Sequence, residues 1–381
     1  MKITRVRTRT LSVPYHRPDR WSGGENHGLT TVLVFVETDA GLTGVGEANG
    51  DRSAAAVAAA VEAMSPLVVG REPFAVEAIT LAIFRRGKWH NVRPFANQAV
   101  VGIEMALWDV IGQACGQPVV NLFGGRVRDE VDFFYYLQQG DRRQMVEDAL
   151  RAVAEGYRVL YLKVGVDDEA DVATLSAVRE AVGNRPKIRV DANEAWPAGH
   201  AVAMIERLRP FDLEFVEQPV PSRDLDGLAR VRAASRVPIA ANQAAFTHYD
   251  VLEVIKRQAA DVIVTGPHQS GGLLQFKKIA ALVETAGLPI NRHAVGELGV
   301  GAAAGLHVMA TLPNLMDGNQ IHHQLLADDV LAEPLQLEGG MLRVPPGPGL
   351  GIVLDADKVE FYARQYEAHG QYYNFPIPDR R

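Results

Sequence analysis

The sequence contains a single cysteine, Cys115, among 381 residues. One thiol cannot form a disulfide within the chain or build a metal site from several cysteines. Long apolar runs are also missing, because no stretch approaches the ~20 consecutive apolar residues that cross a bilayer. The first residues, MKITRVRTRTLSVPYHR, alternate charged and apolar side chains and so lack the apolar core of a secretory signal. We therefore expect a cytoplasmic protein without a membrane partner.

Positive charge is not concentrated in any part of the chain. The sequence has 39 Lys and Arg against 46 Asp and Glu, a formal net charge of −7. Nucleic-acid binding needs a basic patch, so we expect no nucleic-acid partner. Hydrophobic residues make up 47% and charged residues 22%, as in ordinary globular proteins. The length suits about two domains, or one large barrel with an appendage.

Residues 1–125 combine strand and helix patterns. The stretches ITRVRTRTLSV and TTVLVFVETDAGLTGVGEA are typical of strands, and the second contains the turn residues of a hairpin. The polar segment between them, Pro14 to Thr30, is rich in Gly and His and predicts a mobile loop. From Ala54 to Ala114, apolar residues recur at helical spacing. We predict an α+β capping domain over residues 1–125.

From Val131 onward, short apolar runs alternate with amphipathic helical segments. The runs are VDFFYYL, VLYLKVG, KIRVDAN, LEFVEQP, VPIAANQ, DVIVTG, LPINRHA and LPNLMDG. Strand candidates that alternate with helices in this way favour an α/β barrel over an open sheet. We place the barrel in residues 126–325, and we expect the turn-rich residues 326–381 to return to the capping domain.

Three polar residues follow apolar runs at even intervals. Asp191, Glu217 and Gln243 are spaced 26 residues apart. Such spacing suggests successive strand, loop and helix units that deliver the three side chains to one rim. In a parallel barrel, active sites form on the rim at the carboxyl ends of the strands. Two of the three are carboxylates, which suit a hard divalent cation such as Mg²⁺.

Several short motifs, in this order and spacing, resemble the mandelate racemase and muconate lactonizing branch of the enolase superfamily. They are IEMALWD, YLKVG, VDANEAW, EFVEQPV, SGGL and the strand-end His293. The resemblance covers essentially the whole chain and implies a (β/α)7β modified TIM barrel beneath an α+β capping domain. It also implies a Mg²⁺-bound substrate carboxylate, a base that removes the neighbouring carbon's proton, and an enediolate intermediate. Chemistry agrees, because so weak an acid needs both a cation and a placed base.

Lys163 stands at the family's base position, at the end of the second barrel strand. A lysine side chain accepts a proton only when its pKa falls toward the working pH, which burial and nearby cations can cause. Tyr161, two residues earlier on the same strand face, stands where many relatives carry another lysine. Its hydroxyl can donate a hydrogen bond to substrate or act as a weak acid. A surface lysine and a packing tyrosine are the alternatives.

Asp191 and Glu217 match the family's first two metal ligands, and Asn193 matches a residue beside the metal. The alternative is that strand-end acids cap the following helices. Asn242 and Gln243 depart from the family, where an acidic pair normally stands and its second member is the third ligand. Replacing that carboxylate with an amide should weaken metal binding and strengthen the attraction for a substrate carboxylate. An empty metal site is therefore a real alternative.

His293 matches the histidine that many racemases and acid-sugar dehydratases use as a second base or leaving-group acid. The acid that usually partners it is missing, because Gly266 stands at that position. Without a carboxylate, His293 is less basic, and a buried hydrogen-bonded histidine is the alternative. His268 is a candidate to fill the space beside Gly266.

Other candidates for substrate contacts lie near the end of the predicted barrel region and in the N-terminal part of the capping domain. The family's acid on the eighth strand could be Asp317 or Asn319, because the register of that strand is not fixed by the sequence. In the predicted N-terminal loop, His16 and Trp21 resemble a specificity lid by position. The cationic and aromatic content of this loop suits an anionic substrate.

These features predict a Mg²⁺-assisted enzyme that removes an α-proton from a small, acid-sugar-like carboxylate. We expect a dehydratase with Lys163 as base and His293 as acid or base. A racemase or epimerase and a lactone cycloisomerase are alternatives within the family. A retired or metal-independent small-acid binding homologue is an alternative outside its chemistry. The resemblance also implies a homo-oligomer.

Overall fold

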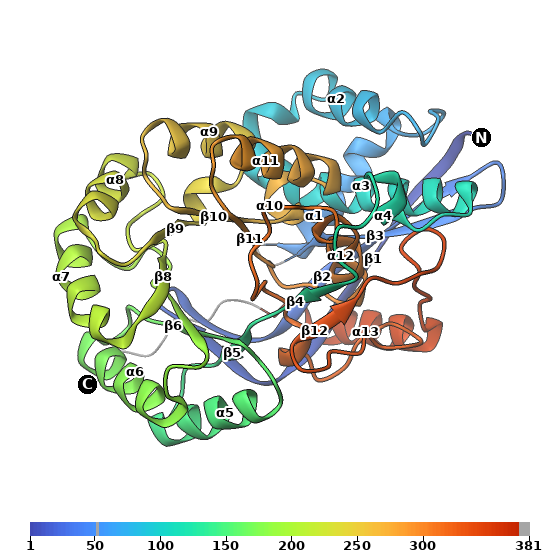
Figure 1. Cartoon of the computed structure of the whole chain (residues 1–381). Coiled ribbons are helices and arrows are strands. Elements are labelled where there is room, and N and C mark those ends of the chain that lie inside the picture. The colour runs from blue at the N-terminus through green and yellow to red at the C-terminus, as the bar shows by residue number, and fades with distance from the viewer. Residues whose placement is uncertain (51–52, 373–381) are drawn as a thin grey trace.

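A computed structural model describes residues 1–50 and 53–372. The capping domain begins with three antiparallel strands, β1 (Ile3–Trp21), β2 (Gly24–Thr38) and β3 (Thr43–Asn49), in that order across the sheet (Figure 1). Four helices follow: α1 (Ala54–Met64), α2 (Val76–Arg86), α3 (Arg93–Cys115) and α4 (Val119–Leu122). Short 3₁₀ turns lie at η1 (Ser65–Leu67), η2 (Trp89–Val92), η3 (Arg209–Phe211), η4 (Gln243–Ala245) and η5 (His323–Leu325).

The cap sheet has two buried faces. Along β2, Val32, Val34 and Val36 pack with α1 and α3 in one hydrophobic cluster, whereas Leu33 and Phe35 belong to the cluster that continues into the barrel. Successive side chains of a strand point to opposite faces, so this alternation allows one strand to serve two cores. The cap is therefore packed firmly onto the barrel.

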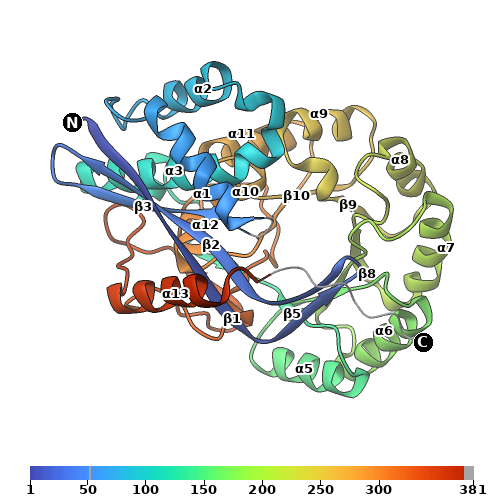
Figure 2. The ribbon, with the colours of Figure 1, turned by 180° about the vertical axis from the view of Figure 1, so that it is seen from behind.

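The segment from Pro14 to Thr30 is not a loop, and this prediction is wrong. It forms the far end of a β1–β2 hairpin, in which Asp19 pairs with Asn26 and Trp21 with Gly24 after a register shift between Pro14 and Asp19. Figure 2 shows this hairpin extending across the barrel. Its strands contain polar residues because one face meets solvent and the other meets a polar cavity, so the usual apolar strand pattern is absent.

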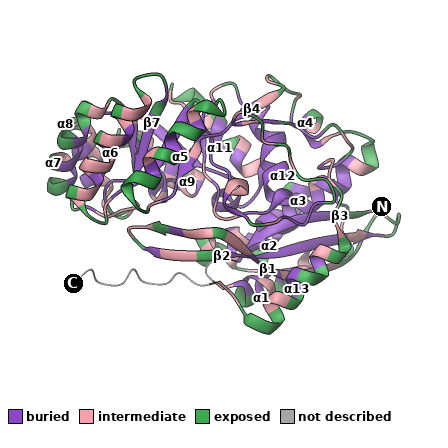
Figure 3. Cartoon of the chain, turned by 90° about the horizontal axis from the view of Figure 1, so that it is seen from below, coloured by how far each residue is buried: buried purple, intermediate pink, exposed green. Residues whose placement is uncertain are grey.

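Seven parallel strands form the barrel wall, hydrogen-bonded in chain order. They are β5 (Tyr135–Leu137), β6 (Val159–Lys163), β7 (Lys187–Asp191), β8 (Leu213–Glu217), β9 (Ile239–Ala241), β10 (Val262–Thr265) and β11 (Ile290–Arg292). Helices cover the outside: α5 (Arg142–Ala154), α6 (Asp168–Val182), α7 (Ala198–Leu208), α8 (Leu225–Ala234), α9 (His248–Lys256), α10 (Pro267–Ser270), α11 (Leu273–Thr285) and α12 (Gly299–Met309). Figure 3 shows exposed residues on the outer faces of α5 to α8 and buried ones within, whereas α10 and α12 are buried throughout. The predicted barrel is confirmed.

The eighth predicted strand, within residues 312–318, is instead an irregular segment that closes the barrel. Leu315 bridges to Ile290 on one side, and Asn319 bridges to Phe133 on the other. Gly318 interrupts the strand with a φ of 68°, and a Cβ there would lie 2.7 Å from a methyl of Val159. A left-handed residue pressed against a neighbour favours glycine and breaks strand geometry.

The last described part of the chain contacts both domains. Strand β12 (Met341–Arg343) pairs antiparallel with β4 (Glu130–Asp132) at the start of the barrel. Helix α13 (Ala356–His369) lies against β1, where Arg9 forms ion pairs with two glutamates of the helix. The boundaries at residues 125 and 325 stay predictions. In the part of the chain that the structure describes, no helix has the length and apolarity to cross a membrane.

Candidate active site

Three neighbouring strands end in charged residues that lie side by side. Lys163 ends β6, Asp191 ends β7 and Glu217 ends β8, and the strand register places Lys163 beside Asp191 and Asp191 beside Glu217. Gln243 follows β9 at the start of η4. The parallel register therefore gathers the evenly spaced residues on one rim, as their spacing indicates.

An ion pair and a tyrosine hydroxyl connect these strand ends. Lys163 Nζ lies 2.5 Å from Asp191 Oδ2, and the lysine is only 9% exposed. The Tyr161 hydroxyl donates to Asp191 Oδ2 at 2.7 Å or to Glu217 Oε2 at 3.2 Å. Burial and the two carboxylates raise the pKa of Tyr161 well above its usual value, so this side chain is a neutral donor. It positions the carboxylates, and it does not line the cavity above them.

Glu217 is fully buried with one oxygen unused. Burial, together with the nearby Asp191 carboxylate, raises its pKa to about 8. Its Oε1 atom has no hydrogen-bond partner among the described residues. A buried acceptor without a partner is costly, so its presence points to a ligand or a proton at this position.

Two amide oxygens nearby are also unpartnered. Gln243 Oε1 and Asn193 Oδ1 are buried acceptors to which no described group donates. Asn193 is held in place by a positive φ of 44° and by its backbone N–H, which donates to Asp191 Oδ1 at 2.8 Å. The Gln243 and Glu217 oxygens, with the adjacent Asp191 carboxylate, make a set of oxygen atoms that fits a hard divalent cation such as Mg²⁺, and Asn193 lies beside it. Among the described residues no group of three His, Cys, Asp or Glu could hold a metal, since an amide stands third.

Asn242 is fully buried beneath this set. Its side-chain amide donates to Val264 O at 3.0 Å, and its backbone N–H donates to Gln218 Oε1 at 2.9 Å. These bonds tie the end of β9 to β10 and to the loop after β8. Its side-chain oxygen is a third buried amide acceptor to which no described group donates, and Asn242 does not line the cavity that the site faces.

His293 follows β11 and faces the same cavity as Lys163. Burial and the Lys163 charge hold the pKa of His293 well below its usual range, so the ring is neutral. Its Nδ1 contacts the side-chain amide of Gln269, from the short helix α10. A Cβ on Gly266 would lie 2.2 Å from His293 O, which leaves no room for the acid expected there. Sequence reasoning missed Gln269, although its place directly after β10 was a usable signal.

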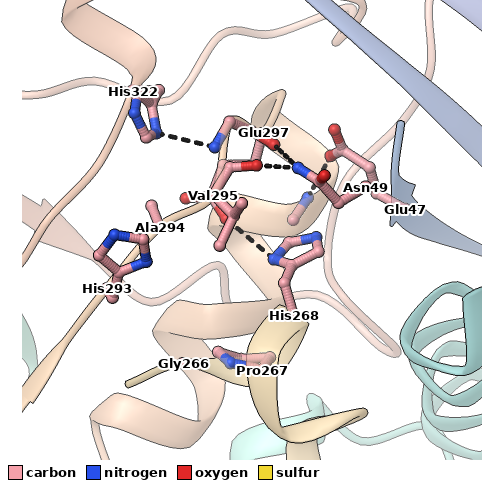
Figure 4. Close-up of polar contacts among 12 residues, drawn as sticks. Glu47, Asn49, Gly266, Pro267, His268, His293, Ala294, Val295, Glu297 and His322 are labelled. Carbon is pink, nitrogen blue, oxygen red and sulfur yellow. Dashed lines mark hydrogen bonds and ion pairs between the residues drawn. The ribbon is translucent and has the colours of Figure 1, made fainter. Parts of the chain in front are cut away.

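Figure 4 shows how the segment after His293 is fixed. Asn49 at the end of β3 donates to Val295 O and Gly296 O, and Glu47 of the same strand accepts from Leu298 N at 2.8 Å. The cap sheet therefore holds the loop that carries His293.

His268 lies within this junction and not at the cavity, contrary to the prediction. It is fully buried, and its Nδ1 is 3.8 Å from Glu297 Oε2. Burial and the Arg292 charge lower the pKa of His268 to about 3. The helical turn of α10 directs His268 to the junction and Gln269 to His293.

A cavity of about 300 Å³ lies above the strand ends and beneath the hairpin. Five of the predicted residues line it: Trp21, Lys163, Asn193, Gln243 and His293. Asp191, Glu217 and Tyr161 lie below them, linked through the Lys163 ion pair. The hairpin also contributes Asp19, which the sequence did not single out.

Two predicted residues lie elsewhere. Asp317 sits 3.8 Å from Arg158, which precedes β6, and so it belongs to the opposite rim of the barrel. Its alternative, Asn319, is buried in the closing segment, where its amide donates to Asp132 O and accepts from Arg292 N. His16 is exposed on β1 and does not line the cavity. The eighth strand therefore supplies no acid to the site.

Comparisons with known proteins agree with this architecture. Residues 3–124 match the model of the mandelate racemase / muconate lactonizing enzyme N-terminal domain, and residues 144–358 match the enolase C-terminal domain-like model. The chain is 33% identical to muconate cycloisomerase 1-2 of Acinetobacter lwoffii, over 94% of this chain and 95% of the relative. It is 28% identical to an arabinonate dehydratase of Saccharolobus solfataricus, over 89% and 92%.

Solved structures give the same family. An isomerase from Streptomyces coelicolor A3(2) is 36% identical, with a TM-score of 0.83 over 96% of this chain and 99% of that one. A dipeptide epimerase from Enterococcus faecalis V583, 30% identical with a TM-score of 0.86 over 92% and 99%, was solved with Mg and a dipeptide. Relatives thus include cycloisomerases, epimerases and a dehydratase, and superfamily members use Mg²⁺. The chain belongs to the mandelate racemase and muconate lactonizing enzyme branch of the enolase superfamily, and it is an enzyme of the lyase or isomerase type.

Proposed function

We propose that the protein is a dehydratase of a small, acid-sugar-like carboxylate, in which Lys163 removes the proton from the carbon next to the carboxylate. The observation that carries this proposal is the convergence of Lys163, Asp191 and Glu217 at adjacent strand ends. Above them lies a cavity that also receives His293. A buried base placed beside bound substrate is what this weakly acidic position requires.

Asp191, Glu217 and Gln243 would hold a Mg²⁺ ion, which would neutralise the charge that builds on the substrate carboxylate as the proton leaves. The chain's own contribution is positional. Tyr161 holds the two carboxylates together through its hydroxyl, and Asn193 N fixes one oxygen of Asp191. These bonds orient the site before substrate arrives, which lowers the cost of reorganisation during the reaction.

Dehydration moves two protons. The α-proton passes to Lys163 Nζ, and the hydroxyl on the next carbon takes a proton from His293 and leaves as water. The remaining enol rearranges to a keto acid. Gln269 beside His293 is neutral, so an entering substrate carboxylate is the group that favours protonation of the ring.

Cycloisomerisation is a second candidate, favoured by the same contact. Because Gln269 cannot stabilise a charged imidazole as a carboxylate would, His293 is a weak base and carries few of the protons that a leaving hydroxyl needs. Lys163 would then act alone, removing the proton as a lactone ring opens and returning it when the ring closes. We also propose that the enzyme is a homo-oligomer, whose subunit number light scattering would give.

A panel of hydroxy acids and lactones in D₂O tests the function. Deuterium at the α-carbon reports proton removal, and the mass and stereochemistry of the product separate dehydration, epimerisation and cycloisomerisation. Lys163→Ala should abolish exchange. Lys187→Ala, an exposed lysine at the other end of the next strand, is the matched control. Exchange that persists in Lys163→Ala would disprove the base assignment, and full activity after chelation would favour a metal-independent site.

A further inference from the structure

Asp19 brings a carboxyl group from the cap hairpin into the cavity. It stands in β1 opposite Asn26, and it is only 9% exposed. Its Oδ1 accepts a hydrogen bond from the Tyr136 hydroxyl at 2.7 Å. Asp19 and Tyr136 both line the cavity that contains Lys163. A carboxyl group held in one orientation at a cavity wall is a preformed hydrogen-bond acceptor.

The neighbouring Asn26 offers a second acceptor. Its Oδ1 is buried, and no described group donates to it. Asn26 also lines the cavity. Two acceptors on the hairpin side require a ligand that brings hydrogen-bond donors, because an unpaired buried acceptor is unfavourable. A hydroxyl group can donate to either of them, and a carboxylate can donate to neither.

The hairpin's positive charges do not reach the cavity, although the sequence suggested that they suit an anionic substrate. Arg17 is bound to Gln138 and Asp148, and Arg20 is bound to Glu25. Among the described residues that line the cavity, Lys163 is the only lysine or arginine. The cavity therefore has a cation at its floor and none on the hairpin side.

We propose that Asp19, oriented by Tyr136, is a specificity-determining residue that accepts a hydrogen bond from a hydroxyl at the end of the substrate remote from the reacting carboxylate. The enzyme would accordingly take polyhydroxy monocarboxylates and reject dicarboxylates, because a second carboxylate would meet the Asp19 carboxylate where Lys163 is the only lysine or arginine among the described residues that line the cavity. This inference deepens the proposed function and rests on it for the orientation of the reacting carboxylate toward Lys163.

Equilibrium binding of three six-carbon probes to intact protein tests this by calorimetry in Mg²⁺ buffer. The probes are an aldonate, the corresponding aldarate with a second carboxylate, and 6-aminohexanoate with an ammonium. The wild type should bind the aldonate at least about 10-fold more tightly than the aldarate, a typical discrimination for a charged hydrogen-bond partner. Asp19→Asn removes the charge of this side chain. It should raise the affinity for the aldarate and so lower the ratio of aldonate affinity to aldarate affinity about 10-fold.

Tyr136→Phe provides a second variant that removes one hydroxyl and keeps the ring. It should weaken aldonate binding and leave aldarate binding low, since Asp19 keeps its charge but loses its orientation. Glu25→Gln, on the same hairpin but bound to Arg20, should change neither affinity. Equal binding of the aldonate and the aldarate to the wild type, or no binding of the aldonate, would overturn the proposal. An unchanged ratio in Asp19→Asn, or a preference for 6-aminohexanoate, would also overturn it.

Because the affinities are also measured in the Lys163→Ala variant, in which no turnover is expected, the two proposals can fail separately. A ratio that depends on Asp19, without α-proton exchange in the aldonate, would refute the reaction and leave the specificity assignment intact. α-Proton exchange that requires Lys163, together with equal affinities for the aldonate and the aldarate, would refute the specificity assignment and leave the reaction intact.

Discussion

This protein has two groups of buried charged residues, one at the cavity and one at the junction between cap and barrel. They differ in how many of their carboxylate oxygens have a hydrogen-bond partner. At the cavity, Asp191 and Glu217 share Lys163 and Tyr161, yet Glu217 Oε1 has no partner among the described residues. At the junction between cap and barrel, Glu47 and Glu297 have a partner for every oxygen.

The junction partners are supplied by the fold itself. Glu47 accepts from the backbone N–H groups of Leu298 and Gly301 at the start of α12, and Glu297 pairs with Arg292 through both oxygens. Paired carboxylate oxygens stabilise one structure, whereas unused acceptors await a ligand. The atoms without a hydrogen-bond partner at the junction include nitrogens of His268 and Arg292, not oxygens of the two glutamates. Substitutions at the cavity should therefore change activity first, and those at the junction should change stability first.

The largest expected effect is on activity at the cavity. Lys163→Met should lower turnover about 10²- to 10⁴-fold, the usual contribution of a general base. Its stability should fall less than that of a junction variant, because Asp191 loses its cation but keeps hydrogen bonds from the Tyr161 hydroxyl and the Asn193 backbone. Steady-state kinetics and denaturant unfolding of the same samples measure both. A variant that unfolds readily, or that keeps a tenth of the activity, would contradict the comparison.

The largest expected effect on stability is at the junction. Arg292→Met would leave the Glu297 carboxylate buried without its cation, and both side chains are essentially inaccessible to solvent. Breaking one partner of a buried ion pair costs about 3–5 kcal/mol. Urea unfolding should report that loss in the free energy of unfolding. A loss below about 1 kcal/mol would mean that the junction is not the stabilising group.

A third carboxylate at the cavity should sharpen the contrast. Gln243→Glu changes the proposed ligand set from two carboxylates to three, so Mg²⁺ affinity should rise by about 10-fold or more. Calorimetry on metal-stripped protein measures it. Gln275→Glu on α11, outside the cavity, makes the same charge change and should have no effect. Equal affinity in wild type and Gln243→Glu would show that residue 243 is not a ligand.

Per pH unit, the smallest effect is the change in stability that Glu47 contributes. Burial raises the pKa of Glu47 from 4.5 to about 8. The folded state thus holds a proton that the unfolded state releases between these pH values, so the stabilising contribution is present below pH 4.5 and is lost as pH rises toward 8. Glu47→Gln should flatten this slope by up to about 1.4 kcal/mol per pH unit. Urea unfolding of wild type and Glu47→Gln should be compared across this pH range. If the free energy of unfolding changes with pH equally in both, the raised pKa of Glu47 is refuted.

The sequence predicted the barrel and its charged rim because both depend on local patterns. A strand followed by a helix repeats every few tens of residues, and parallel strands bring their ends to one rim, so Asp191, Glu217 and Gln243 could be placed together from spacing. The family resemblance placed Lys163 beside them, as the register shows. The family motifs contain these same residues. The closing segment was wrongly predicted as an eighth strand, because the apolar run before Gly318 has the composition of a strand but not its geometry.

The missed residues owe their positions to contacts between distant segments. Asp19 meets Tyr136 across 117 positions, and Gln269 meets His293 only after α10 has turned it toward β11. The hairpin was mistaken for a loop because its strands carry polar side chains. These side chains face a cavity that forms only when several distant segments pack together. Such pairings depend on tertiary packing, which overrides local propensity.

The contact between β1 and α13 has a consequence for synthesis in the cell. Ser12 donates to Gly370 O, a hydrogen bond between residues 358 positions apart. A ribosome adds about 5–20 residues each second, so the outer face of β1 waits tens of seconds for its cover. During that interval β1, the long strand that also carries Asp19, has an unprotected edge. Chaperones bind such edges, which otherwise pair wrongly with other chains.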